Sequence, residues 1–364
     1  MAEEEETVIH MGPQHPSVHG FSLKLKLNGD YVMEVEPLLG YFHRSAEKVM
    51  EFRTFDQCIL IMERLSMLEP MLFQYPFVDA VEKIAGVKPP ERAEYLRMLT
   101  MELSRIQSML FWIGQHSSEL GLFTLMMWPW RDREYILDIF EKITGARHTT
   151  AYIVPGGVRW DANDEAIKQI REALRYLRKR IKLYRRMFLD SPTFRLRTYG
   201  IGVLKPADAI RFSVTGPNLK ASGIGADLRK DAPYSLYDEL EFEVPTETEG
   251  DAYARMKVRL REIELAMDLV EQIIPKIPKG ELSAKFPRTL PVGDYYGRVE
   301  EARGILGVYV RSVDERATQP YRVKVRGPSF NHMHLIQHLA RGVHLADFPA
   351  VLGSLDTYPG DMDR

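Results

Sequence analysis

The sequence is poor in cysteine, and this excludes several kinds of site. Cys58 is the only cysteine, so an intrachain disulfide and any Cys-x-x-Cys metal or iron–sulfur site are ruled out. A charge surplus is missing too, since 49 Lys and Arg residues face 51 Asp and Glu residues. Because a polyanion-binding protein carries a basic surplus, we expect no nucleic-acid partner. Scarce cysteine and abundant charge suit a cytosolic protein.

Long apolar runs are also lacking. The longest uncharged one, residues 120–130, is too short to cross a bilayer. We expect it to lie in the core, with a partner-docking surface as the alternative. The acidic start, Met1 to Glu6, has neither the basic residues nor the apolar stretch of a signal peptide. Any attachment to a membrane is therefore expected to run through other subunits.

The sequence contains no motif of a self-sufficient cofactor site. Its glycine-rich pieces, at residues 156–157, 200–202 and 223–225, lack the spacing of phosphate-binding loops. There is no Gly-x-Ser-x-Gly nucleophile motif and no His-Glu-x-x-His zinc motif. We therefore expect this chain to bind no cofactor of its own.

Hydrophobic periodicity predicts both strands and helices. Alternating apolar residues over 21–27 and 31–35, joined by Asn28-Gly29-Asp30, predict a β-hairpin that ends at Pro37. Apolar residues three and four apart predict long amphipathic helices. The helices are expected at residues 93–116, 163–189 and 251–275, with further strands at 305–311 and 321–326 and a shorter helix at 331–341.

These elements predict one continuous α+β unit over residues 1–364, centred on a helix bundle. Within it we expect a β-hairpin region at 1–36, a helical region at 37–192 and a mixed α/β region at 193–364. Neither internal repeats nor flexible linkers divide the chain.

Two short segments carry side chains that are typical of chemistry. His15 and His19 belong to one loop, where they either bind a metal or form local hydrogen bonds; Pro16 between them argues against a helix and so against the metal. His43 and Glu47 are four residues apart, the spacing of an ordinary surface pair on a helix. The residues alone assign no reaction to either segment.

Several longer blocks run through nearly the whole chain. They are Gly12-Pro13-Gln14-His15-Pro16-x-x-His19-Gly20, Gly40-x-x-His43-Arg44-x-x-Glu47-Lys48, Ala80-Val81-Glu82-Lys83, Ala151-Tyr152-Ile153-x-Pro155-Gly156-Gly157-Val158, Gly216-Pro217-x-Leu219-x-x-Ser222-Gly223 and Pro320-Tyr321-Arg322-Val323-Lys324-Val325-Arg326. Together they resemble the large subunit that carries the quinone site of respiratory complex I, a family similar in turn to the large subunit of nickel–iron (NiFe) hydrogenases. The resemblance implies a hydrogenase-large-subunit-like α+β fold with a central helix bundle, an N-terminal β-hairpin and small C-terminal sheet elements.

The hydrogenase comparison concerns four metal-binding positions. In those enzymes four cysteine thiolates hold nickel and iron, since these metals favour soft ligands. The corresponding positions here are Phe55, Cys58, Tyr358 and Asp361. One thiolate among four makes a poor soft-metal site, so the resemblance implies no metal centre in this chain.

The complex I comparison concerns the quinone headgroup, which that family holds with a tyrosine and a histidine. His19 matches the histidine, and the aspartate that partners it is represented by Glu119. The tyrosine position is Met67, whose side chain donates no hydrogen bond. A subunit without either the thiolates or the tyrosine is similar to the membrane-bound type that reduces sulfane sulfur or polysulfide with ferredoxin electrons. Quinone reduction is the alternative, followed by a purely structural subunit and, last, a hydrogenase.

The resemblance also implies site residues. His19 would donate a proton with Glu119 orienting it, and Cys58 would react with a sulfur substrate unless it is a buried relic. The expected substrate-binding residues are His15, Arg53, Asp56, Arg64, Met67, Tyr358 and Asp361. A structural role or a proton route is expected for His43, Arg44 and Glu47.

Partners and location follow from the same resemblance. It implies a small iron–sulfur subunit carrying 4Fe-4S clusters, other peripheral-arm subunits, and antiporter-like, proton-pumping membrane subunits. The chain is expected on the cytoplasmic side of the cell membrane, as a peripheral oxidoreductase subunit that is active only within its complex.

Overall fold

A three-stranded antiparallel sheet opens the chain. The computed structural model describes residues 6–15, 17–18, 20–362 and 364, beginning with β1 (Glu6–Met11), β2 (Ser22–Asn28) and β3 (Tyr31–Leu38). Asn28 pairs with Tyr31, which confirms the predicted hairpin, whereas β1 was not predicted. The prediction that Pro37 ends the strand is wrong. Pro37 pairs with Leu23 because β3 is an edge strand, where a missing N–H is tolerated.

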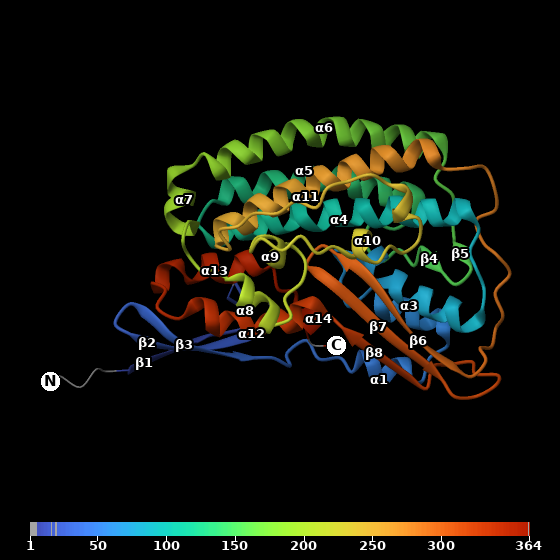
Figure 1. Ribbon diagram of the computed structural model, residues 1–364, viewed down its shortest axis with the longest axis horizontal. Helices are drawn as coiled ribbons and strands as arrows, with labels where there is room; N and C mark the ends of the chain where they lie inside the picture. Colours follow the sequence, from blue (N-terminus) through green and yellow to red (C-terminus); the bar gives the residue numbers. More distant parts are fainter. Residues whose placement is uncertain (1–5, 16, 19, 363) are drawn as a thin grey trace.

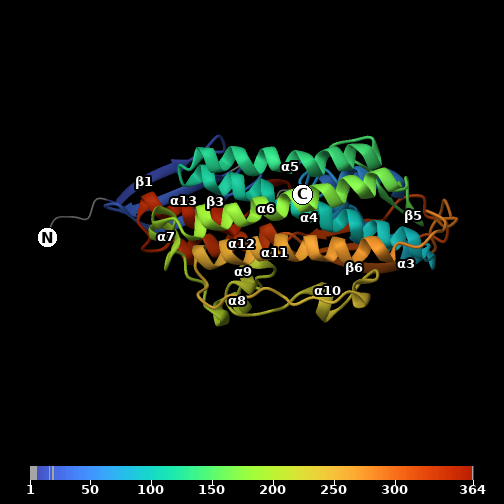
Figure 2. The ribbon, with the colours of Figure 1, turned by 90° about the horizontal axis from the view of Figure 1, so that it is seen from above.

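Four long helices run side by side through the middle of the molecule (Figures 1 and 2). They are α4 (Glu91–Glu119), α5 (Phe123–Thr144), α6 (Asp164–Leu189) and α11 (Ala252–Ile273). The amphipathic pattern predicted all but α5. Asn163 caps α6 by accepting a hydrogen bond from the Ala166 N–H at 2.9 Å, and Asp251 caps α11 in the same way.

The apolar run at 120–130 spans the turn after α4 and the start of α5, and it is only partly buried. Leu125 and Pro129 face the core, whereas 65% of Phe123 and 61% of Met127 is exposed. The core prediction therefore holds for one face of this segment, and the other face leaves large apolar side chains at the surface.

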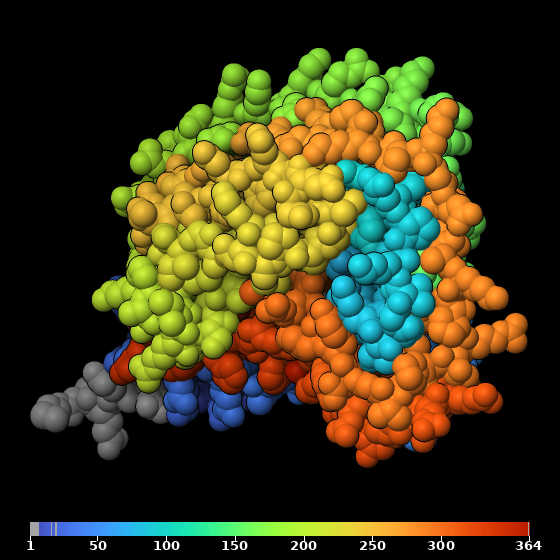
Figure 3. Space-filling view, turned by 45° about the vertical axis from the view of Figure 1, so that its right-hand side comes forward, coloured from blue at the N-terminus to red at the C-terminus, as the bar shows by residue number. Residues whose placement is uncertain are grey.

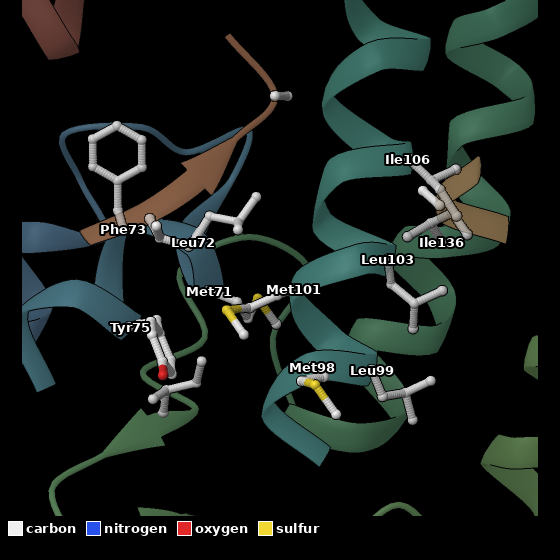
Figure 4. Close-up of a cluster of buried hydrophobic side chains, with 14 of the residues drawn as sticks. Met71, Leu72, Phe73, Tyr75, Met98, Leu99, Met101, Leu103, Ile106 and Ile136 are labelled. Atoms are coloured by element: carbon white, nitrogen blue, oxygen red, sulfur yellow. The ribbon is translucent and has the colours of Figure 1, made fainter. Parts of the chain in front are cut away.

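Helix α3 (Pro70–Ala85) links the bundle to a second sheet. On one side its buried residues meet α4, where Met71 faces Met101 (Figure 4). On the other side it packs against the antiparallel strands β6 (Gly293–Glu301) and β7 (Gly304–Ser312), with β8 (Arg322–Arg326) at the edge. The last two strands were predicted, and β6 was not.

The chain between α6 and α11 lies across one side of the bundle. In Figure 3 it is the yellow-green to yellow surface beside α11 and the start of α4. Its regular pieces are short: α7 (Pro192–Thr198), α8 (Pro206–Arg211), α9 (Pro217–Lys220), α10 (Leu228–Asp231) and the single turn η1 (Tyr237–Glu239). This segment brings buried charged residues against α4 and α11.

Short elements complete the fold at both ends of the bundle and beneath it. They are α1 (Ala46–Met50), α2 (Phe55–Met62), the hairpin β4 (Ile153–Val154) and β5 (Gly157–Val158), the turns η2 (Ile274–Lys276) and η3 (Leu345–Asp347), α12 (Pro328–Ala340), α13 (Phe348–Leu355) and α14 (Pro359–Met362). Helix α12 confirms the helix predicted at 331–341. Helix α13 packs on α4 and α11, so the C-terminal segment is carried to the end of the bundle. The division at residues 36 and 192 stays a prediction.

Candidate functional site

A cavity of about 230 Å³ lies where the end of α4, the residues before α3 and the C-terminal helices meet. Most of its wall is apolar, and the larger apolar lining residues are Phe42, Met67, Leu68, Phe111, Trp112 and Leu352. Three charged side chains also line it, namely Glu119, Arg303 and Asp356. A pocket that is largely apolar, with a few convergent polar groups, is the usual form of a small-molecule site.

Arg303 is the cation of this cavity, and it is held by acids from distant parts of the chain. It lies in the turn between β6 and β7 and is 2% exposed. One guanidinium nitrogen, Nη1, pairs with Glu69, while Nε lies 3.3 Å from Asp356. Its planar group also sits 5.2 Å from the ring centre of Tyr358. The cation is therefore fixed in position before any ligand arrives.

Asp356 connects the cavity to a second buried arginine. It ends α13 in a left-handed backbone conformation, with φ of 54°, which is strained for a residue other than glycine. Its carboxylate lies 3.4 Å from Arg259 as well as against Arg303. Burial raises the pKa of Asp356, and the two guanidinium groups oppose that rise. Asp356 is thus a half-buried acid of the cavity wall that two cations hold in place.

Glu119, the last residue of α4, has a partner that sequence reasoning missed. Its carboxylate lies 3.3 Å from Nδ1 of His116, one turn earlier, and His116 stacks on Trp112. Gly353 leaves room for this carboxylate, since an added Cβ would lie 1.5 Å from Glu119 Oε2. The predicted pairing of Glu119 with His19 stays a prediction because His19 lies outside the described residues.

Three of the ten predicted site residues line the cavity: Met67, Glu119 and Tyr358. Met67 is half exposed at its rim. Burial raises the pKa of the Tyr358 phenol, so this group stays protonated and can donate a hydrogen bond. The structure thus brings together residues from three segments that are far apart in the sequence.

Cys58 is not among the residues that line the cavity. It is fully buried in α2, and its thiol donates to the carbonyl oxygens of Met50 at 3.4 Å and Arg53 at 3.7 Å. Burial raises the pKa of this thiol to about 12, so almost no thiolate exists at neutral pH. These contacts favour the alternative of a small, packed hydrophobic residue over a reactive one.

Four other predicted residues lie on the surface, outside the cavity wall. Arg53 and Asp56 flank the start of α2 and are exposed. Arg64 donates to the Leu60 carbonyl at 2.6 Å and pairs with Glu63 at 3.0 Å. His15 is also exposed, and its Nδ1 accepts a hydrogen bond from the backbone of Ser17. Their roles in substrate binding stay predictions.

Asp361 and Glu47 hold the C-terminal segment in place. Asp361 is buried in α14 and accepts a hydrogen bond from the Ser329 N–H at 2.8 Å. Glu47 accepts from the Val325 N–H at 2.9 Å and pairs with Lys324 at 3.0 Å and Arg364 at 3.2 Å. These contacts fit the structural role expected for Glu47.

Comparison with known proteins shows which family has this architecture. Residues 119–290 and 283–364 match the profile of the family described as "Respiratory-chain NADH dehydrogenase, 49 Kd subunit". The chain belongs to this family.

Whole-chain relatives agree with this membership in the 49-kDa-subunit family. An NADH-quinone oxidoreductase subunit of Desulforamulus reducens is 41% identical over 362 residues, covering 99% of this chain and 98% of the relative. The same subunit of Geobacillus kaustophilus is 39% identical over 367 residues, with 100% of both chains covered. Among solved structures, a chain of "the membrane-bound sulfane sulfur reductase (MBS), an archaeal respiratory membrane complex" has a TM-score of 0.95 and 37% identity, covering 100% of both chains.

This member of the 49-kDa-subunit family is therefore a peripheral oxidoreductase subunit of a multisubunit, complex I-like respiratory complex. The predicted hydrogenase-large-subunit-like α+β fold is confirmed. Within the described residues, no helix is long and apolar enough to cross a membrane.

A nickel–iron centre does not fit the donors of this chain. Of the four positions that carry thiolates in hydrogenases, Phe55 offers no donor and Cys58 directs its thiol at backbone carbonyls. Asp361 bonds to Ser329, and the ring of Tyr358 lies under Arg303. Hard oxygen donors and one protonated thiol are a poor match for nickel.

Sequence reasoning missed Arg303, Glu69 and Glu301, which surround the inner wall of the cavity. Glu300-Glu301-Ala302-Arg303 is a charged stretch that the structure buries almost completely. Charged residues are mostly exposed, and they are buried only where partners surround them. From the sequence alone this stretch therefore looks like part of the surface. Glu69 is equally hidden, because it precedes an apolar helix and looks like an ordinary surface acid.

Proposed function

We propose that the cavity beside Arg303 is where electrons from a neighbouring iron–sulfur subunit reduce sulfane sulfur in the form of polysulfide. Reduction takes two electrons and one proton and splits a terminal S–S bond, releasing hydrosulfide and a polysulfide one sulfur shorter. The whole-chain likeness to a subunit of a sulfane sulfur reductase carries this proposal.

Two features of the cavity support an anionic acceptor without a quinone headgroup. Arg303 is its cation, and a guanidinium group binds anions without losing its own charge. Met67 lines the cavity, and by the family resemblance it stands where a tyrosine would hold a quinone; its thioether donates no hydrogen bond. A soft, polarisable sulfur at the rim suits a sulfur chain better than a carbonyl oxygen.

The surrounding complex is proposed from the same family membership. Electrons would arrive from a 4Fe-4S cluster of a small iron–sulfur subunit, since this chain has a single cysteine. Other peripheral subunits and proton-pumping membrane subunits would hold the chain on the cytoplasmic side of the cell membrane. His19 as proton donor, with Glu119 beside it, stays part of this proposal.

Quinone reduction is the second candidate, and the relatives favour it. Those of 41% and 39% identity are named as subunits of an NADH-quinone oxidoreductase. The aromatic wall of Phe42, Phe111 and Trp112 would also accept a flat ring.

Assays of the purified complex separate the two candidates. With reduced ferredoxin as donor, we expect sulfide release from polysulfide and no reduction of a soluble quinone. Met67→Tyr should lower polysulfide turnover by filling the rim with a hydroxylated ring, whereas Met67→Leu, which keeps a similar volume and loses only the soft sulfur, should lower it less. Quinone-dependent turnover without sulfide release, strengthened by Met67→Tyr, would replace this proposal with the second candidate.

A further inference from the structure

Helix α6 carries far more positive charge than the rest of the chain. Between Asp164 and Leu189 it has nine Lys and Arg residues and three acids, although the whole chain has a net charge of -2. It is the outermost helix of the bundle, along the upper edge of the molecule in Figure 1, and Figure 2 looks onto it from above. The positive charge is therefore concentrated on one ridge of the surface.

Three of the nine cations pair with neighbouring helices. Arg178 and Arg185 pair with acids of α11 at 2.6 Å and 3.3 Å, and Arg180 pairs with the buried Asp132 of α5 at 2.6 Å. These ion pairs lie where α6 packs against the bundle. The three cations therefore serve to attach the helix.

The other six cations form one row along the outer face of α6. Their steps of three and four residues place them on one side of the helix, and all six are exposed. Within the part of the chain that the structure describes, none of them has an acid at ion-pair distance. With a rise of 1.5 Å per residue the row is about 27 Å long. This basic row consists of Lys168, Arg171, Arg175, Lys179, Lys182 and Arg186.

The basic row is unfavourable for the chain on its own. Like charges three or four residues apart weaken a helix, and the row has five such neighbouring pairs in succession. Glu172 is the single acid beside it, four residues after Lys168 and three before Arg175, and it pairs with neither of these two described residues. Because protein surfaces usually mix both signs of charge, a row of one sign indicates compensation from outside the chain.

A groove of about 550 Å³ adjoins the first half of the basic row. Ile167 of α6, Ile274 of η2 and the nearby Ile277 give it an apolar lining. Five cations line it as well, three of them from the basic row, against two acids. The groove thus offers an apolar contact beside a cationic border, which fits a segment that carries an apolar side chain next to acidic ones.

We propose that the basic row and this groove bind an acidic segment of a neighbouring subunit in the respiratory complex. An apolar side chain of the segment would contact the isoleucines, and its Asp and Glu side chains would lie along the row. Such neighbours exist because this chain is a subunit of a multisubunit complex. The docking is independent of the acceptor that the cavity reduces, since no described residue of α6 lines that cavity.

A lipid surface fits the basic row less well than an acidic protein segment. A helix that lies on a membrane inserts apolar side chains below the headgroups. Residues 164–189 are all described, and each of their large apolar side chains is buried or half-buried in the bundle. Half of the row is arginine, whose planar guanidinium group matches a carboxylate with two parallel hydrogen bonds.

Zero-length cross-linking of the purified complex tests the contact without any variant. A carbodiimide joins lysine amines directly to carboxyl groups, so only groups in contact react. We expect Lys168, Lys179 and Lys182 to be linked to Asp or Glu residues of one other subunit, identified by mass spectrometry of the linked peptides. Lys205, which precedes α8 and is also exposed, is the matched control and should not be linked to that subunit. A basic row without links to another subunit would overturn the proposal.

Reversing charges in the middle of the basic row tests its contribution to docking. Lys179→Glu combined with Lys182→Glu should leave α6 folded, because both positions are exposed and glutamate is as good a helix former as lysine. We expect about a tenfold fall in the amount of the linked subunit that remains with the complex at about 0.15 M salt, measured by quantitative mass spectrometry. Replacing the same two lysines by glutamine should give a smaller fall.

The matched control for the reversal lies in another part of the surface. Lys205→Glu combined with Arg211→Glu changes the net charge equally at two exposed positions beside and in α8. We expect the complex to keep all its subunits in this control. An unchanged amount of the linked subunit in the basic-row variant, or an equal fall in the control, would overturn the proposal.

Binding to vesicles separates the lipid alternative. We expect the complex with Lys179→Glu and Lys182→Glu to bind vesicles of phosphatidylglycerol and phosphatidylcholine as the unmodified complex does, which would exclude lipid as the occupant of the basic row. A variant that loses vesicle binding while its subunit composition stays complete would assign the row to an anionic membrane surface and overturn the protein partner.

Discussion

The thiol of Cys58 illustrates how burial decides reactivity at the scale of a single residue. A thiol must ionise to attack sulfur, and burial raises the pKa of Cys58 to about 12. We therefore expect the folded complex to resist alkylation by iodoacetamide at about pH 8, as measured by intact mass. Cys58→Ala should keep turnover, and alkylation that abolishes sulfide release would restore Cys58 as a reactive group.

Glu300 gives the fold a dependence on pH. Burial, then the nearby charge of Asp227, raises its pKa from 4.5 to about 7. Because the folded state holds a proton that the unfolded chain releases, stability from this group falls as pH rises from about 4.5 to about 7. Glu300→Gln should remove that fall, measured as the difference in thermal unfolding between variant and unmodified complex across this range. An equal pH dependence in both would contradict the assignment.

At the scale of elements, buried ion pairs join helices that the chain separates widely. Arg229 in α10 pairs with Glu102 in α4 at 3.2 Å and with Glu262 in α11 at 3.1 Å. All three side chains are almost completely buried. Such pairs fix how the elements dock, because any arrangement that separates them leaves a buried charge without a partner.

Arg229→Leu should weaken this docking by about 3–5 kcal/mol, the cost of leaving buried carboxylates unpaired. Hydrogen exchange of peptides from α4 and α11 in the purified complex would measure the loss. Arg178→Leu is the matched control. Arg178 also pairs with two acids, Asp268 at 2.6 Å and Glu271 at 2.9 Å, but these groups are exposed, so we expect less than about 1 kcal/mol. Equal effects would contradict this account.

The helices that the sequence predicted, α4, α6 and α11, share apolar residues at three- and four-residue steps over many turns. Helix α4 is nevertheless buried on nearly all sides, with several charged residues inside. Helix α3 contains Pro76 in its interior, a residue that normally ends a helix, so it was missed. Strand β6 was missed because Asp294, Tyr295 and Tyr296 are exposed and read as a loop.

At the scale of the whole molecule, exposed apolar side chains indicate where partners bind. Phe52 and Leu60 are 61% and 39% exposed and lie in the α1–α2 segment, close in sequence to the cavity rim at Met67. The iron–sulfur partner that we propose would approach this rim to deliver electrons, and covering these side chains would stabilise that contact.

We expect Phe52→Ser combined with Leu60→Ser to reduce co-purification of the iron–sulfur subunit, measured by quantitative mass spectrometry of the complex. Leu196→Ser is the control, since Leu196 is 81% exposed but lies in α7 at the opposite end of the molecule (Figure 1). Loss of the partner in the control alone would place the interface elsewhere.

The sequence by itself determined the family, the helix bundle and part of the cavity wall. Motifs and periodicity are local properties, so Met67, Glu119 and Tyr358 could be named from the family pattern and later lined the cavity. The tertiary structure alone decided which candidates stay outside it. By its place in the sequence Cys58 is a candidate to react with sulfur. In the folded chain, however, its thiol is buried and donates to backbone carbonyl oxygens.

Only folding could reveal the acids around Arg303. Glu69 and Glu301 lie 232 positions apart in the printed sequence, and neither belongs to a motif. Their convergence on Arg303 depends on long-range packing of α3 against β6, which removes water and brings two carboxyl groups to one guanidinium. Desolvation and proximity are properties of the assembled interior, and a linear sequence carries no measure of either.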